Sequence, residues 1–138
     1  MEVNKDIRWK QRFDNLEKVY LMLEKYLQIE NPSDIERAGG IHLFELCFEL
    51  SWKTMKDFLE SEGFQLNSPR NVIKQAFQSD LIDEGHLWID LLDDRNLYTH
   101  IYDEKIANEI DIRIKGKYYQ LIKRLCERFK EEKKCTVS

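Results

Sequence analysis

Six side chains that can bind anions or exchange protons lie together between residues 95 and 102: Arg95, Asn96, Tyr98, Thr99, His100 and Tyr102. The fork of donors on an arginine matches the oxygens of a phosphodiester. A histidine can take or give a proton near neutral pH, because its reference pKa is about 6.5. An Arg and a His acting together could therefore cleave RNA without a metal ion, the ribose 2′-OH attacking its own phosphate.

The position of Arg95 on its helix is unusual for a charged residue. It follows Trp88 by seven residues and Leu92 by three, so it falls on the apolar stripe of a predicted helix. There it must be paired, extend to solvent or line a cleft. Tyr98 and Tyr102 would share its face on a continuing helix, whereas His100 would point about 140° away. For Arg95 and His100 to serve one site, the helix must bend or a second molecule must complete the site.

A purely structural interpretation of this segment stays open at this point. Arg95 could pair with Asp93, Asp94 or Asp103, and His100 could simply cap the end of the helix. One Arg and one His within a short window are common, so spacing alone does not separate the two interpretations.

The elements that must position these residues are predicted to be helices joined by short connections. Apolar residues recur at helical spacing, and the predicted ranges are about 6–29, 33–60, 68–80, a fourth helix from Asp83, and 103–130. Ser33 with Glu36 forms a capping box, Ser68-Pro69 starts the third helix, and Gly39-Gly40 should weaken or break the second. Phe77 is expected to face inward. The fold class is therefore all-α, a four- to five-helix up-and-down bundle.

Length and composition limit the remaining possibilities. With 138 residues, 42% of them hydrophobic, and only 5 Gly and 2 Pro, we expect one helical domain over residues 1–138, with a frayed tail from about residue 131. No stretch approaches the roughly 20 apolar residues of a membrane span, and no signal peptide is evident, so we expect a cytoplasmic protein without a membrane partner. The three cysteines lack metal-ligand spacing, and Cys47 is expected in the core. We expect no metal site and no cofactor in this chain.

Charge is distributed unevenly along the second half of the chain. Residues 81–111 hold nine acidic and two basic residues, whereas residues 112–138 hold nine basic and three acidic ones. Such polarity favours a protein partner, self-association or a basic face that meets phosphates. The acidic segment contains the Arg95–His100 pair and would repel RNA. Basic residues of the last helix could offset that field, possibly across a dimer: Lys115, Lys117, Lys123 and Arg124.

The residues from Arg95 to Tyr102 also resemble a known family pattern. Arg95-Asn96-Leu97-Tyr98-Thr99-His100-Ile101-Tyr102 matches the R-x4-H-x-Y form of small helical HEPN toxins that are paired with minimal nucleotidyltransferase antitoxins. Three longer segments are similar to the nucleotidyltransferase substrate-binding protein family: FELCFELSWKTMKDFLESEGF, SPRNVIKQAF and LDDRNLYTHIYDEKIA. The resemblance covers roughly residues 8–129.

This resemblance implies a homodimer with the motif beside the dimer cleft, and a minimal nucleotidyltransferase, encoded nearby, as partner. It implies that Arg95 and His100 form a ribonuclease pair, that Asn96 helps to position them, and that Tyr102 is adenylylated by the partner, which would use ATP and Mg²⁺. Two hypotheses follow: a partner subunit of a two-component nucleotidyltransferase, or a metal-independent endoribonuclease toxin that adenylylation of Tyr102 silences. This chain is not expected to be a nucleotidyltransferase itself.

Overall fold

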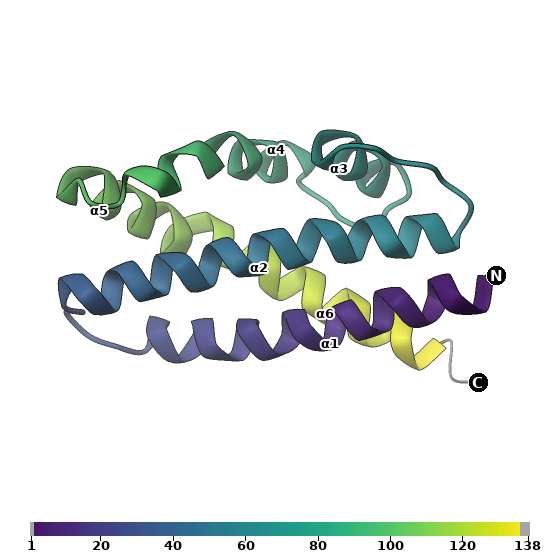
Figure 1. Ribbon diagram of the computed structural model, residues 1–138, viewed down its shortest axis with the longest axis horizontal. Coiled ribbons are helices and arrows are strands. Elements are labelled where there is room, and N and C mark those ends of the chain that lie inside the picture. Colours follow the sequence, from purple (N-terminus) through teal and green to yellow (C-terminus); the bar gives the residue numbers. More distant parts are fainter. Residues whose placement is uncertain (1, 136–138) are drawn as a thin grey trace.

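A computed structural model describes residues 2–135, with side chains from residue 4, and it is all-α. The elements are α1 (Glu2–Leu27), α2 (Asp34–Ser61), α3 (Pro69–Gln78), α4 (Gly85–Asp94), the 3-10 helix η1 (Arg95–His100), α5 (Glu104–Arg113), the π-helix η2 (Ile114–Tyr118) and α6 (Tyr119–Cys135). Because α4 runs directly into η1, and α5 runs through η2 into α6, five helical segments make up the described fold (Figure 1). The prediction of an all-α helical bundle is confirmed.

The antiparallel pair of α1 and α2 forms one layer of the bundle (Figure 1). The apolar stripe of α1 is buried at Phe13, Leu16 and Leu23, as its spacing predicts. Helix α2 begins at the Ser33–Glu36 capping box, which satisfies two backbone amides at the helix start. Of the two outcomes predicted for Gly39-Gly40, weakening or a break, the break does not occur, because α2 is continuous over Asp34–Ser61.

Gly40 explains why α2 continues. It is buried against the ring of Tyr26, and a Cβ at this position would lie 2.3 Å from a ring carbon. Glycine is therefore required there for the close approach of α1 and α2 rather than for a turn. Gly39 faces open space.

Helix α2 is the central element, since α1, α3, α5, η1 and α6 all pack on it. Phe44, Cys47, Phe48 and Met55 are fully buried along its length, which confirms the expectation for Cys47. Gly63 adopts φ +104° just beyond the helix end, a left-handed backbone conformation that glycine adopts without strain.

Two details of the second layer differ from the sequence prediction. Phe77 is 52% exposed instead of inward-facing, because α3 is short and buries only Val72, Ile73 and Ala76. The N-cap of α4 is Glu84 rather than Asp83, with a left-handed φ of 48° and no side-chain cap. The chain therefore turns into α4 through the left-handed backbone conformation of Glu84, without a side-chain cap.

The last helical segment runs from Glu104 through the π-turn to Cys135, five residues beyond the predicted end at Lys130. Its end is held to α1 by ion pairs from Lys130 to Glu17 and from Lys133 to Asp14. The tail predicted to fray from about residue 131 is therefore helical as far as Cys135, and residues 136–138 lie outside the described part. None of the helices within residues 2–135 is long and apolar enough to cross a membrane.

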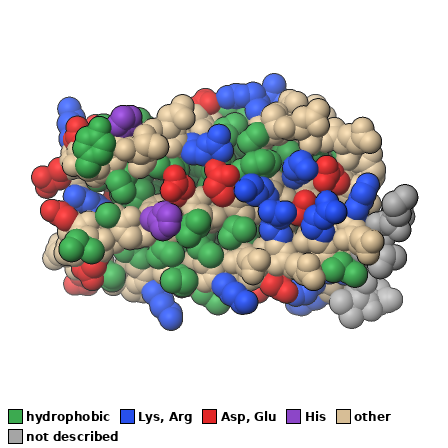
Figure 2. Space-filling model, viewed as in Figure 1, with side chains coloured by type: hydrophobic (Ala, Val, Ile, Leu, Met, Phe, Trp, Pro, Cys, Tyr) green, Lys and Arg blue, Asp and Glu red, His purple; other side chains and the backbone are tan. Residues whose placement is uncertain are grey.

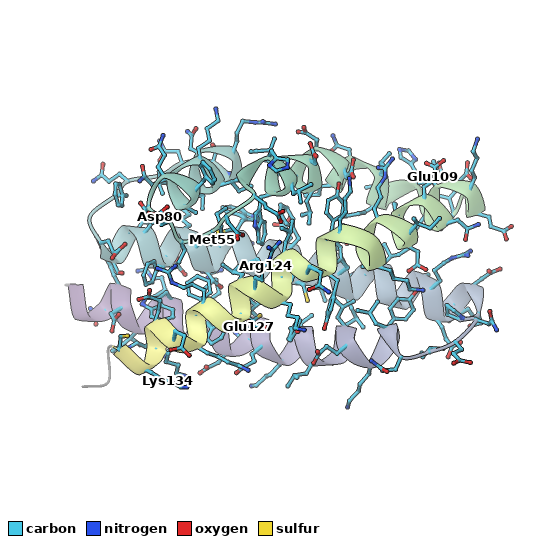
Figure 3. All side chains as sticks on the ribbon, turned by 180° about the vertical axis from the view of Figure 1, so that it is seen from behind. Met55, Asp80, Glu109, Arg124, Glu127 and Lys134 are labelled. Atoms are coloured by element: carbon cyan, nitrogen blue, oxygen red, sulfur yellow. The ribbon has the colours of Figure 1, made fainter. Side chains whose placement is uncertain are left out.

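Apolar and basic side chains are spread unevenly over the surface. On one broad face, apolar side chains gather over part of the surface and Lys and Arg over another part (Figure 2). Seen from behind, α6 crosses the bundle, and Arg124, Glu127 and Lys134 lie along it (Figure 3).

Candidate functional site

The backbone between α4 and α5 decides how the R-x4-H-x-Y residues are displayed. After Asp94 the chain tightens into the 3-10 helix Arg95–His100 and then turns into α5. A 3-10 helix has about three residues per turn, so residues three apart, such as Arg95 and Tyr98, lie on one face. Tyr98 is buried and, like Arg95, packs on α2, as its spacing predicts. Tyr102 lies beyond the 3-10 helix and is 82% exposed, so the prediction that it shares the face of Arg95 on a continuing helix is wrong.

The side chain of Arg95 contacts the central helix, α2. Its Nη1 donates to Oε1 of Glu49 at 2.9 Å, and the two side chains are 38% and 30% exposed. The second carboxylate oxygen of Glu49 accepts from the indole Nε1 of Trp52 at 2.9 Å. Arg95 is thus a paired but half-exposed guanidinium that retains donors for an anion.

The acidic residues that sequence spacing suggested as partners of Arg95 are engaged elsewhere. Asp93 pairs with Arg70 at 2.8 Å, Asp94 accepts from Arg113 at 3.0 Å, and Asp103 caps α5 through the amide of Lys105. The structural interpretation was therefore right that Arg95 is paired and wrong about the partner, which comes from another helix.

His100 and Tyr102 form an exposed pair of their own. Nδ1 of His100 lies 3.1 Å from the hydroxyl of Tyr102, and the two rings meet at 65°. Asn96 is exposed, and its backbone carbonyl accepts a hydrogen bond from the hydroxyl of Thr99 at 3.1 Å. Among the described residues, no hydrogen bond or ion pair joins Arg95 to His100. One chain therefore presents them as two neighbouring pairs, Arg95–Glu49 and His100–Tyr102.

A partly buried polar network holds the start of the turn in place. The hydroxyl of Tyr118 donates to Oδ2 of Asp94, the residue directly before Arg95, and Arg113 pairs with the same oxygen. Burial, followed by the hydrogen bond to Asp94, raises the pKa of Tyr118 well above its usual range. The π-helix Ile114–Tyr118 supplies this tyrosine at the point where α5 passes into α6. A local π-turn shifts the register of the residues that follow it, and such turns are frequent at functional sites.

Tyr98 lies in the same interior region. Its ring packs edge-on against the ring of Phe44, with 6.3 Å between the ring centroids. Its buried hydroxyl has no hydrogen-bond partner among the described residues. Burial raises the pKa of Tyr98 far above its usual range, so this hydroxyl stays neutral. Tyr98 therefore serves packing, whereas Tyr102 is the tyrosine of the motif that faces solvent.

Comparison with known proteins identifies the family. The pattern of the family described as nucleotidyltransferase substrate binding protein like matches residues 11–131. The chain belongs to this family. A crystal structure of a Thermus thermophilus protein is similar with a TM-score of 0.75 at 34% identity, covering 82% of this chain and 97% of that one.

Two further matches come from Haemophilus influenzae, a solved structure and a curated protein. One, described as revealing the fold of a substrate binding domain of a nucleotidyltransferase, has a TM-score of 0.77 at 25% identity and covers 86% of this chain and 98% of that one. The other is probable ribonuclease HepT, 31% identical over 75 residues. This match covers 51% of each chain, so the chain spans about half the length of that curated relative.

Sequence reasoning missed the residues that position the motif in this member of the nucleotidyltransferase substrate-binding-like family. Glu49, Asp94, Arg113 and Tyr118 come from α2, α4, α5 and η2, and their partners are distant in sequence. One signal was available: Glu49 is a charged residue within the most apolar helix, three residues before Trp52. Within residues 4–135, no group of three His, Cys, Asp or Glu side chains could hold a metal ion.

Proposed function

We propose that this chain is the helical partner subunit of a minimal nucleotidyltransferase and that Tyr102 accepts the nucleotide the partner transfers. Family membership implies such a partner, since the family is described by its likeness to nucleotidyltransferase substrate-binding proteins. The observation that carries the proposal is the exposure of Tyr102 at 82%, with its hydroxyl 3.1 Å from Nδ1 of His100. A partner active site can reach this hydroxyl without any unfolding of the bundle.

The transfer has a simple chemical balance. The phenolic oxygen of Tyr102 attacks the α-phosphorus of ATP, an O–P bond forms, and the bond to the bridging oxygen breaks as pyrophosphate leaves. The phenolic proton passes to Nδ1 of His100, which already lies within hydrogen-bonding distance. The partner would supply the site for ATP and Mg²⁺.

A second function, metal-independent cleavage of RNA, is favoured by the similarity to probable ribonuclease HepT. In this scheme Arg95 binds the scissile phosphate, His100 exchanges protons with the ribose 2′-OH, and Asn96 helps to position them. Arg95 and His100 are not joined by a contact within the described part of one chain, so a homodimer in which the two motifs face each other would best complete the site. Adenylylation of Tyr102 would then place a phosphate against His100 and exclude RNA by bulk and charge.

The charge around the motif weighs against RNA binding by a single chain. The ion pairs of α6 reach Asp83 and Glu84 through Arg124, and α1 through Lys130 and Lys133. Arg124 lies along α6 in the view from behind, and it pairs with the residues directly before α4 (Figure 3). Arg124, one of the four basic residues expected to offset the acidic field, is therefore engaged within its own chain.

Intact-mass spectrometry of the chain, co-expressed with its neighbouring nucleotidyltransferase and supplied with ATP, tests both functions. We expect added AMP units on the wild type and on Tyr98→Phe, the matched control whose hydroxyl is buried, but none on Tyr102→Phe. The unmodified chain should then cleave RNA and the modified chain should not. A complex that forms without added mass would remove Tyr102 as acceptor and leave the binding-subunit role. No complex and no added mass would contradict the proposal.

A further inference from the structure

A small pocket opens directly beside Tyr102. It has a volume of about 200 Å³ and lies between the first turns of α2 and of α5, with Tyr102 on its rim. The residues that meet there, 34–38 and 101–107, are distant in sequence. The pocket is thus formed by tertiary packing next to the hydroxyl that the proposed function assigns as acceptor.

The lining of the pocket combines an apolar surface with few polar groups. Ala38, Ile101 and Ala107 provide the apolar surface. Small side chains at two of these three positions leave room for an apolar ring such as an aromatic base. Pockets for small ligands typically pair such a surface with a few placed polar groups.

Arg37 is the cation of this pocket. Its side chain is only 14% exposed and is held by Oδ1 of Asn108 and by Oδ1 of Asp34, the latter at 3.2 Å. These two bonds fix the guanidinium but leave further N–H donors for an anion. The carboxylates of Asp34 and Glu104 also line the pocket and can accept from an exocyclic amino group. Together they favour a base that carries an amino group, such as adenine.

We propose that this pocket binds the adenosine monophosphate attached to Tyr102, with the base against Ala38 and Ala107 and the phosphate paired with Arg37. This inference rests on the proposed function, because it concerns the nucleotide transferred to that tyrosine. A nucleotide held in this way keeps the Tyr102 side chain in one position beside His100 instead of leaving it free to move. Silencing then depends on the fold as well as on the covalent bond.

The first test needs neither partner nor modification. The full chain is titrated with AMP while backbone amide shifts are followed by NMR. We expect saturable shifts at Ala38, Glu104 and Ala107 with a Kd on the order of a millimolar, and at least tenfold weaker binding in Ala38→Leu and in Arg37→Gln. Arg70→Gln, which removes another paired surface arginine, should bind AMP like the wild type. Shifts absent from the pocket, or unchanged affinity in both pocket variants, would overturn the proposal.

The second test uses the adenylylated chain. Nuclear Overhauser contacts from the adenine protons to the methyl groups of Ala38 and Ala107 are expected, and their absence on a chain of confirmed added mass would contradict the pocket. Should Tyr102 carry no added mass, the acceptor assignment fails by itself, and the AMP titration still decides whether the pocket binds the nucleotide.

Discussion

Nη1 of Arg95 lies 2.9 Å from Oε1 of Glu49, so the arginine of the motif is held by the central helix and not by any of its acidic neighbours in sequence. The carboxylate has two effects on the guanidinium. It orients the side chain, and it competes with any phosphate for the same donors. Glu49 is therefore expected to govern anion binding at the motif.

Glu49→Gln separates these two effects. The amide oxygen can still accept from Arg95, the hydrogen bond from Trp52 is lost, and the competing charge is gone. We therefore expect a fluorescent single-stranded RNA oligonucleotide to bind severalfold more tightly at low salt. Stability should change by less than about 1 kcal/mol, because the pair is partly exposed. Fluorescence anisotropy measures the affinity, and Glu60→Gln, which loses a pair with Lys56 on the same helix, is the control. Equal or weaker binding in Glu49→Gln would contradict the competing role.

His100→Ala should slow nucleotide transfer to Tyr102, because the imidazole is the hydrogen-bonding partner placed to take the phenolic proton. Loss of a general base typically costs about 10²-fold or more in rate. Time-resolved intact-mass spectrometry with a fixed amount of the partner measures this rate. His86→Ala is the control, since it removes a histidine that lies in the first turn of α4 rather than in the motif. Unchanged kinetics in His100→Ala would show that the partner provides its own base.

Gly40→Ala and Gly39→Ala should have opposite effects on stability. A methyl group at Gly40 would lie 2.3 Å from the ring of Tyr26, and such overpacking costs about 1–3 kcal/mol. At Gly39 the space is open, and alanine should stabilise the helix by about 0.5–1 kcal/mol. Urea unfolding of the two variants measures both changes. A neutral Gly40→Ala would contradict the close approach of α1 and α2, and a destabilised Gly39→Ala would contradict the open space at that position.

Tyr118→Phe should loosen the start of the motif turn. The variant removes the hydrogen bond to Asp94, an interaction with a charged group worth about 2 kcal/mol, and leaves only Arg113 on that carboxylate. Amide hydrogen exchange over residues 95–100 should quicken relative to the wild type. Tyr119→Phe is the matched control, since the hydroxyl of Tyr119 bonds to Glu24 on α1 instead. Equal exchange in both variants would show that the turn does not depend on Asp94.

The cysteines should differ sharply in reactivity. Burial raises the pKa of Cys126 to about 12, so only about one thiol in ten thousand is ionised at pH 8, and burial raises the pKa of Cys47 further. Cys135 is exposed. Iodoacetamide at pH 8 should therefore add one label to the native chain and three after unfolding in urea, as counted by mass spectrometry. Rapid labelling of Cys47 in the native protein would contradict its burial.

Local sequence determined the helices and their core faces, because both depend on interactions within a few residues. Phe13, Leu16 and Leu23 repeat with the period of a helix, and Ser33 with Glu36 caps a helix wherever it lies in the fold. The same kind of local information identified Arg95, Asn96, His100 and Tyr102 as one candidate group. It could not foresee that the helix would end at His100 and leave Tyr102 exposed in the following turn, because an α-helix is the default continuation of the pattern.

The tertiary structure alone decided what each of these side chains contacts. Glu49 reaches Arg95 across 46 positions and Tyr118 reaches Asp94 across 24, and no spacing rule spans such distances. The pocket beside Tyr102 depends likewise on the packing of α2 against α5. The partners of the motif side chains and the walls of the pocket depend on which helices become neighbours. Burial of all the apolar faces together selects that arrangement of helices.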